Sequence, residues 1–516
     1  ELAGEFFRSR TDTEVVLKSL VKSGTDALTH FQGMFSLAYY DGLSRTLILA
    51  IDPIGIKPLY YHINKERLIF CSEIKPLFLD QKTPRQANLK ALSQHVLYGY
   101  ALAPLTAFDE IYKLEPGSYL EVTHAGVKKC SYFSIQEFFT DEVPSFEMVE
   151  NTFDKAMRLH IRADVPCGTF LSGGLDSTLM VASLAMQKKL HSDFKAFNVG
   201  TDTSSSEGGL YAERRGATLT AKKYNIDLVK VDPPTLSNFN LDYIVNTLEE
   251  PMCNPAAILI DQICSQARLN QIPVLLSGHG GDEIFAGYRR HIWARYLPFF
   301  RPFYPLISLI TSHNKNNLWQ KILTSLSPDI PEPLIPLTAI GWDLVHNWNI
   351  APELCPPDRV WSASESFFER LKPFENHSPL KRLMVLDFSS YLSSQNLLVM
   401  DKMSMKHSIE VRVPFLYKSL VKVGWNLPDS KLVFGKCGKQ PLRNLARKRL
   451  SKELLKTKKI GFDFSLKNWI YSEQGKDLLL SEQTRKRSLF NHKSIEDLLK
   501  LDLHKNTNII PLYNLA

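Results

Sequence analysis

The first 135 residues contain short, largely apolar runs that are divided by turn residues. Runs of this kind, rich in β-branched and aromatic residues, are typical of β-strands. The predicted strands cover residues 33–41, 45–52, 58–64 and 67–73, with a further pair inside 117–133. We therefore expect a front domain of layered sheets.

From about residue 148 the pattern changes to buried strands that alternate with helices. Helices are predicted over 148–161, 177–190 and 212–225, and strands over 167–171, 194–200, 227–232 and 271–278. This alternation predicts a parallel sheet with right-handed crossovers. After Tyr288 the pattern is mostly helical. We place the boundary near residues 136–147, which gives domains over 1–136 and 148–516.

Composition fits this picture. The chain has 516 residues, 44% of them hydrophobic and 22% charged, as expected of two or three folded domains. Its seven cysteines form no C-x-x-C pair, which favours reduced thiols and a cytoplasmic location. The apolar stretch 296–310 is interrupted by three prolines and an arginine, so we expect a packed surface helix or lid and no membrane partner.

The net charge of +8 is concentrated in one segment. Between Lys439 and Lys459 the chain carries nine Lys or Arg against one Glu. Such a run is usually a solvated helix face. It could also attract nucleic acid or the phosphates of a small anionic substrate.

The strongest chemical signal is "FLSGGLDS", residues 170–177, where an apolar strand gives way to a helix. Its two glycines let the backbone turn several N–H groups toward one point, and its serines add hydroxyl donors at the positive end of the helix. Such a nest suits a pyrophosphate. Asp176 would repel phosphate unless a cation intervened, which indicates Mg²⁺.

With a second glycine-rich turn, "LSGHGGDE" at residues 276–283, the chain resembles the glutamine-hydrolysing asparagine synthetases of the ATP-pyrophosphatase superfamily. The resemblance is carried by residues 162–177, 276–288, 401–416 and 456–462, and in the front domain by "FQGMFSLAYYD", "DPIGIKPLYY" and "CSEIK". It implies an incomplete α+β front domain of the N-terminal nucleophile hydrolase type, with layered antiparallel sheets. An α/β ATP-pyrophosphatase domain with a helical C-terminal half would follow.

The resemblance implies an amide-forming ligase that uses ATP and Mg²⁺. The side-chain carboxylate of aspartate would attack ATP, giving an acyl-adenylate and pyrophosphate, and ammonia would then displace AMP to give asparagine. Ammonia would come from glutamine in a full-length form. The implied partners are small molecules, without nucleic acid, and a homodimer is left open.

The resemblance also assigns residues. Those implied to bind ATP are Leu171, Ser172, Gly173, Gly174, Asp176, Ser177, Val199, Gly200, Ser277 and Gly278. Asp176 and Asp282 would hold Mg²⁺, and Lys459 would stabilise charge during adenylation or amide transfer. Asp12 matches the acid that binds the α-amine of glutamine. Asp401, Glu410 and Arg412 could form a buried ion-pair network that positions the site, or they could simply stabilise the helical half, and we favour the structural role.

The chain departs from the family pattern in two places. The family's catalytic cysteine is the first residue of the mature chain, whereas residue 1 here is Glu, so we expect this chain not to hydrolyse glutamine. His279 stands where asparagine synthetases usually carry Glu or Asp and β-lactam synthetases carry Tyr. A histidine there could act as a general base or as a neutral spacer.

Two alternatives to an aspartate ligase remain open. The same chemistry could act on another carboxylate, such as a sugar uronate, a peptide or a secondary-metabolite acid. A different class is an ATP-pyrophosphatase that acts on RNA, for which the basic run is the support.

Overall fold

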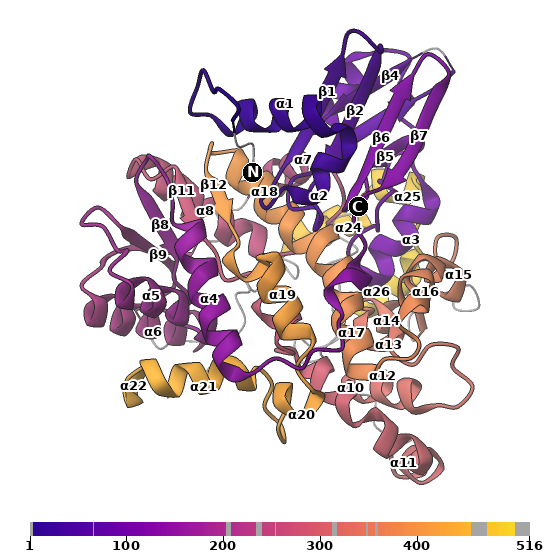
Figure 1. The fold of residues 1–516 in the computed structure, drawn as a ribbon. Coiled ribbons are helices and arrows are strands. Elements are labelled where there is room, and N and C mark those ends of the chain that lie inside the picture. The colour runs from indigo at the N-terminus through magenta and orange to yellow at the C-terminus, as the bar shows by residue number, and fades with distance from the viewer. Residues whose placement is uncertain are drawn as a thin grey trace.

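A computed structural model describes residues 4–65, 67–202, 208–233, 240–252, 254–311, 317–346, 349–356, 360–455 and 472–500. Within these ranges the N-terminal part of the chain forms antiparallel sheets and the middle part forms one parallel sheet. The C-terminal half is helical (Figure 1). This confirms the predicted fold class. The exact boundary between the two domains stays a prediction.

Two antiparallel sheets form the front part. One has the order β1-β2-β6-β7 and the other β4-β3-β5. The strands are β1 (Ser36–Asp41), β2 (Thr46–Ile51), β3 (Tyr60–Ile63), β4 (Leu68–Cys71), β5 (Ile111–Lys113), β6 (Ser118–Thr123) and β7 (Gly126–Ser131). The helical elements are α1 (Asp12–Ser23), η1 (Gly24–Asp26), α2 (Ala27–His30), η2 (Lys75–Leu79), α3 (Leu89–Tyr98) and η3 (Ile135–Phe138).

Strand β2 shows how a short apolar run builds the layers. Leu49 and Ile51 pack with Tyr61 of the second sheet, whereas Ile48 and Ala50 pack in the separate cluster that contains α1 and α2. Successive side chains of a strand point to opposite faces, so an unbroken apolar run can serve two cores at once. The front part is therefore a layered unit with helices on one face and the second sheet on the other.

The middle of the chain forms a five-stranded parallel sheet in the order β10-β9-β8-β11-β12. Its strands are β8 (Cys167–Phe170), β9 (Lys195–Val199), β10 (Asp227–Val231), β11 (Val274–Leu276) and β12 (Glu410–Arg412). Helix α4 (Phe146–His160) precedes the first of these strands. The helices between or after the strands are α5 (Leu175–Met186), α6 (Gly208–Tyr224), α7 (Leu241–Leu248), α8 (Ala256–Leu269) and α9 (Gly281–Ile284). Strand β12, inside the region predicted as helical, was missed.

The C-terminal half is helical, apart from β12. Its first helices are α10 (Arg289–Phe300), η5 (Arg301–Phe303), α11 (Tyr304–Thr311), α12 (Asn317–Leu326), α13 (Ile335–Thr338), α14 (Trp342–His346), α15 (Val360–Ala363), α16 (Glu365–Leu371) and η7 (Lys372–Phe374). A continuous helical rod follows, made of α17 (Pro379–Asp387), the π-helix η8 (Phe388–Asn396) and α18 (Leu397–Met405). The chain then forms η9 (Pro414–Leu416), α19 (Lys418–Trp425), α20 (Asp429–Leu432), α21 (Gln440–Arg449), α22 (Lys452–Leu455), α24 (Glu473–Leu480), α25 (Glu482–Lys486) and α26 (His492–Leu499).

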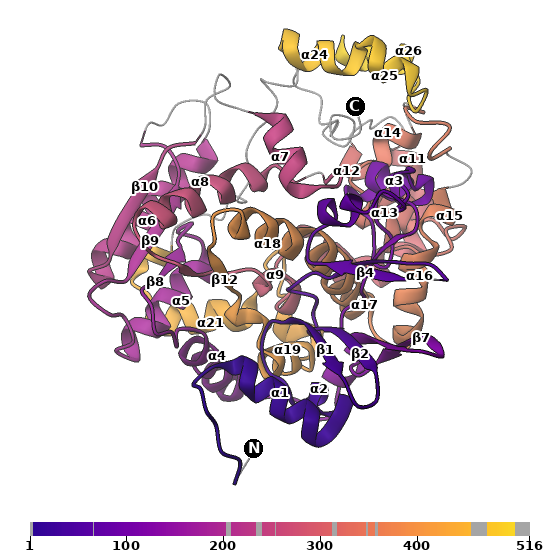
Figure 2. The same ribbon diagram turned by 90° about the horizontal axis from the view of Figure 1, so that it is seen from above.

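Seen from above, α18 lies between the parallel sheet and the front strands (Figure 2). The six cysteines within the described ranges are free thiols, as predicted. None of the helices in those ranges has both the length and the apolar character needed to cross a bilayer.

Candidate active site

The two glycine-rich turns meet at one edge of the parallel sheet. "SGGLDS" follows β8 and "SGHGGDE" follows β11, and these strands are neighbours with Thr169 paired to Leu276. From β8 the chain builds β9 and β10 on one side, whereas β11 and β12 lie on the other. Connections that leave in opposite directions open a crevice at the carboxyl ends of the strands. A cavity of about 840 Å³ lies at this point.

Most of the predicted site residues line this cavity. From the ATP-binding set these are Leu171, Ser172, Gly174, Asp176, Ser177, Val199, Ser277 and Gly278. His279 and Asp282 line it as well. Segments more than 100 residues apart in the sequence are thus brought together as the motifs predicted.

Gly173 and Gly200 are not in the cavity wall, and both are packed against α6. Gly173 has a φ of +71°, and a Cβ there would lie 2.6 Å from the Cα of Gly216. A Cβ on Gly200 would lie 2.7 Å from the carbonyl oxygen of Leu210. These glycines let the loops after β8 and β9 approach the helix closely, so they shape the site from behind.

The first turn forms a cradle for an anion. Gly174 is the N-cap of α5, a 12-residue helix whose first N–H groups face the loop. The Ser172 hydroxyl lies 3.2 Å from that of Ser177 and accepts a hydrogen bond from the Gly174 N–H at 3.3 Å. Hydroxyls held beside the positive end of a helix suit a phosphate.

Lys439, from the N-cap of α21, joins the two predicted metal-binding carboxylates. Its Nζ lies 2.8 Å from Oδ1 of Asp282 and also forms an ion pair with Asp176. Lys439 is only 3% exposed. Burial alone would lower the pKa of its ammonium group, but the two carboxylates raise it above its usual range, so the group is cationic.

The donor set at this point fits Mg²⁺. Asp176 and Asp282 converge on one cation, and Oδ1 of Asp176 is buried without a hydrogen-bond partner among the described residues. In those ranges no group of three or more His, Cys, Asp or Glu side chains could hold a metal alone. Two carboxylates completed by phosphate oxygens are the usual protein arrangement for Mg²⁺.

His279 lines the cavity together with Asp282. Its Nδ1 is 2.7 Å from the hydroxyl of Ser277, the residue that directly follows β11. Burial lowers the pKa of His279 to about 4, although the nearby Asp282 partly opposes this effect. The imidazole is therefore neutral at pH 7.

Beyond His279, the cavity wall contains a carboxyl group that the motif analysis did not assign. Glu283 is almost fully buried and accepts a hydrogen bond of 2.6 Å from the Tyr288 hydroxyl. Burial, together with the adjacent Asp282, raises the pKa of Glu283 to about 7. This carboxyl can therefore gain or lose a proton near neutral pH.

An ion-pair cluster holds two aromatic rings in the same wall. The Arg290 guanidinium lies 4.3 Å from the centre of the Tyr288 ring and 5.0 Å from that of Tyr391. Asp387 binds both Arg290 and His291 at 2.8 Å. Tyr391 belongs to η8, and π-helices frequently occur at functional sites. The cluster therefore holds two of the rings that line the cavity.

Further lining residues come from segments without a recognisable motif. They are Glu213, Asn254, Pro255, Ala256, Arg289, Ile340, Gln395, Asn396 and Met400. Lys439 was also missed, because in the sequence it is one of nine cations in the basic run. Lys459 lies outside the described residues. Asp12 is exposed at the start of α1, away from this cavity, and its role stays a prediction.

The expected network of Asp401, Glu410 and Arg412 is not a single unit. Arg412 binds Glu410 at 2.6 Å and donates to the carbonyl of His160, which ties β12 to the end of α4. Asp401 instead pairs with Lys57 of the front domain at 2.7 Å. The three side chains therefore do not form one network, and the contacts of Asp401 and Arg412 each join separate segments of the chain, which agrees with the favoured structural role.

The chain matches two sequence families. An asparagine synthase family matches residues 148–513, and a glutamine amidotransferase domain matches residues 1–133. Asparagine synthetase (glutamine-hydrolyzing) 1 of Bacillus subtilis is 28% identical over 96% of this chain and 77% of its own length. Asparagine synthetase (glutamine-hydrolyzing) 2 of that organism is 26% identical over 83% of this chain and 55% of its own length. Amidase chry2 of Gibberella zeae is 28% identical over 56% of this chain and 45% of its own length.

Proposed function

Because the chain belongs to the asparagine synthase family, we propose that it is an ATP-dependent ligase that converts aspartate to asparagine. The side-chain carboxylate of aspartate attacks the α-phosphorus of ATP, and pyrophosphate leaves. Ammonia then attacks the acyl-adenylate and releases AMP. The observation that carries this proposal is the convergence of the phosphate cradle and two carboxylates in one cavity.

In this proposal the first turn binds the phosphates of ATP. Ser172, Ser177 and the N-terminus of α5 offer the donors, and Leu171 and Val199 lie beside them in the wall. Asp176 and Asp282 would hold Mg²⁺, which supplies positive charge to the phosphates when bound. Lys439 already places one cation there, so it also opposes the charge of the departing pyrophosphate.

The opposite wall would receive the carboxylate substrate. Arg289 lines the cavity and is exposed, so its guanidinium can pair with a second carboxylate such as the α-carboxylate of aspartate. Glu283, whose pKa is raised to about 7, is suited to accept a proton from the attacking ammonia nitrogen. We propose that Lys459, which is not among the described residues, stabilises the adenylate.

A second candidate keeps this chemistry and changes the carboxylate substrate. It is favoured by His279, a neutral side chain in the cavity wall where an acid is usual in asparagine synthetases. Neutral His279 would repel an anionic substrate less than a Glu or Asp at the same position would. The site would therefore accept a different acyl group. An RNA substrate has less support, because Lys439 is buried in ion pairs and Arg449 pairs with Glu150 and Asp154.

The proposal is tested by ATP–pyrophosphate exchange that depends on the added acid. Aspartate, glutamate, a uronate and a peptide ending in aspartate would be compared, with ammonium salts or glutamine as nitrogen donors in product assays. Exchange with aspartate that is lost in Asp176→Asn supports the proposal. Exchange with another acid but not with aspartate supports the second candidate, and exchange with no carboxylate contradicts both.

A further inference from the structure

Two segments of the chain run from the front domain to the ATP cavity. One consists of residues 249–252 and 254–256, between α7 and α8, and the other of residues 396–402, at the start of α18. Each has one end against the front sheets and the other end in the cavity wall. We call this pair of segments the frame.

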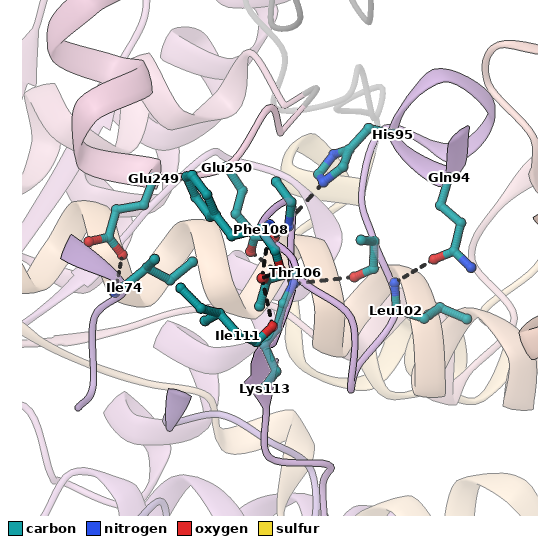
Figure 3. Close-up of polar contacts among 12 residues, drawn as sticks. Ile74, Gln94, His95, Leu102, Thr106, Phe108, Ile111, Lys113, Glu249 and Glu250 are labelled. Carbon is teal, nitrogen blue, oxygen red and sulfur yellow. Dashed lines mark hydrogen bonds and ion pairs between the residues drawn. The ribbon is translucent and has the colours of Figure 1, made fainter. Parts of the chain in front are cut away.

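Glu249 forms the front end of the first segment. It ends α7 in the left-handed conformation, with φ of +64°. Its carboxylate accepts a hydrogen bond of 2.9 Å from the Ile74 N–H (Figure 3). It accepts another of 2.8 Å from the Lys75 N–H. It also forms an ion pair with Lys402 of the second segment. One carboxylate thus joins the front domain to both parts of the frame.

Glu250 enters the front domain more deeply. It is only 2% exposed, accepts a hydrogen bond of 2.9 Å from the Ala107 N–H and lies 2.9 Å from Nζ of Lys113 (Figure 3). His95 Nε2 lies 4.0 Å away. Burial by itself would raise the pKa of Glu250, but Lys113 and His95 lower it below its usual value, so the buried side chain is an anion.

The second segment has its own contacts with the front domain. Asp401 pairs with Lys57 at 2.7 Å, and the ammonium group of Lys402 lies 5.0 Å from the centre of the Tyr60 ring. Asn396 is the last residue of η8, and Lys402 lies six residues later in α18. At 1.5 Å per residue, the two are about 9 Å apart along the helix axis. Asn396 and Met400 both line the cavity.

The two segments of the frame also contact each other at the cavity. Asn254 donates a hydrogen bond of 3.2 Å to Oδ1 of Asn396, and both side chains are in the wall. Within the described residues of the first segment, the Met252 N–H donates a hydrogen bond of 2.7 Å to the Glu250 carbonyl, and the Asn254 N–H donates one of 3.1 Å to the Met252 carbonyl. A shift of Glu249 or Glu250 against the front domain would therefore move Asn254 and Asn396 in the cavity wall, only a few residues away.

We propose that Glu249 and Glu250 are positioning residues that hold the frame against the front domain and thereby set the shape of the ATP cavity. The front domain then has a role in nucleotide binding that is separate from any glutamine chemistry. This inference rests on the proposed binding of ATP in the cavity. It predicts that weakening a contact more than one helical turn from the cavity lowers the affinity for ATP.

The test uses the whole chain and measures MgATP binding by calorimetry. Glu249→Gln, Glu250→Gln and the milder Lys57→Met are compared with Glu365→Gln. Glu365 also bridges the two halves, through Lys90 at 3.3 Å, but it is 67% exposed and away from the frame. We expect Glu249→Gln and Glu250→Gln to raise the Kd for ATP by about tenfold, and Lys57→Met to raise it as well. Glu365→Gln should leave the Kd within about twofold of the wild-type value.

A stability control separates positioning from a general loss of folding. Leu49→Ala weakens the core of the front domain without touching the frame. If Leu49→Ala lowers Tm as much as Glu250→Gln but leaves the Kd for ATP unchanged, the inference holds. It is overturned if Leu49→Ala weakens ATP binding equally, or if Glu249→Gln and Lys57→Met both bind ATP like the wild type. A wild-type chain that does not bind ATP would instead contradict the proposed function.

Discussion

Replacing Lys439 with Met would remove the only cation that the described residues place between Asp176 and Asp282. Methionine has nearly the same length and keeps the packing, so the main loss is the positive charge. The two carboxylates, 16% and 18% exposed, would then face each other across a partly buried gap. The variant should be less stable than the wild type.

The size of this effect follows from the burial of the ion pairs. Removing one partner of a buried pair typically costs about 3–5 kcal/mol, because the remaining charge stays desolvated. The carboxylates keep some contact with solvent, which places the expected loss near 3 kcal/mol. For a domain of this size, each kcal/mol lowers Tm by about 2–4 °C, so Tm should fall by about 6–12 °C.

Thermal unfolding with and without Mg²⁺ checks this prediction. A divalent cation bound by both carboxylates replaces the missing charge, so millimolar Mg²⁺ should raise the Tm of Lys439→Met more than that of the wild type. Lys448→Met is the matched control, since Lys448 is 64% exposed in its pair with Glu150 and should change stability by less than about 1 kcal/mol. A Tm shift for Lys439→Met no larger than that of the control, with no extra response to Mg²⁺, would refute the reasoning.

Three further variants test other parts of the site. The folded-state pKa of His279 is lowered to about 4, so protonation between pH 6.5 and 4 opposes folding. In urea unfolding between pH 7 and pH 4, His279→Gln should therefore lose up to about 3 kcal/mol less stability than the wild type. An equal loss would contradict a neutral imidazole in the folded chain. Lys459→Gln should bind ATP normally yet lower carboxylate-dependent pyrophosphate exchange by about 10²- to 10³-fold; unchanged exchange would remove Lys459 from the chemistry. Gly173→Ala should abolish ATP binding measured by calorimetry, because φ is +71° and a Cβ would meet the backbone of Gly216, and normal binding would show that the loop has another conformation.

The sequence predicted the parts of the site whose signal is local. The turn after β8 carries its own glycines, hydroxyls and carboxylate within six residues, so the strand, the cradle and the helix N-terminus could all be inferred from one motif. His279 and Asp282 were found for the same reason, because both belong to one short turn. The layered front sheets followed from the short apolar, β-rich runs such as β2, which are divided by turn residues.

The rest depended on contacts between distant segments. Lys439 is 263 residues from Asp176, and its neighbours in the sequence are other cations with surface roles, so nothing local marks it as part of the site. Strand β12 has only three residues, and its partner β11 lies more than 130 residues earlier. Glu249 and Glu250 look like ordinary surface acids after a helix, and only the folded chain places them against Ile74 and Lys113.

The central claim is that ATP is cleaved between its α and β phosphates by attack of a substrate carboxylate. It is tested most directly with aspartate labelled with ¹⁸O in its side-chain carboxylate, MgATP and an ammonium salt, followed by mass spectrometry of the nucleotide product. We predict AMP that carries one ¹⁸O from the carboxylate, together with pyrophosphate and asparagine. Formation of ADP and phosphate, or of AMP without the label, would contradict the account.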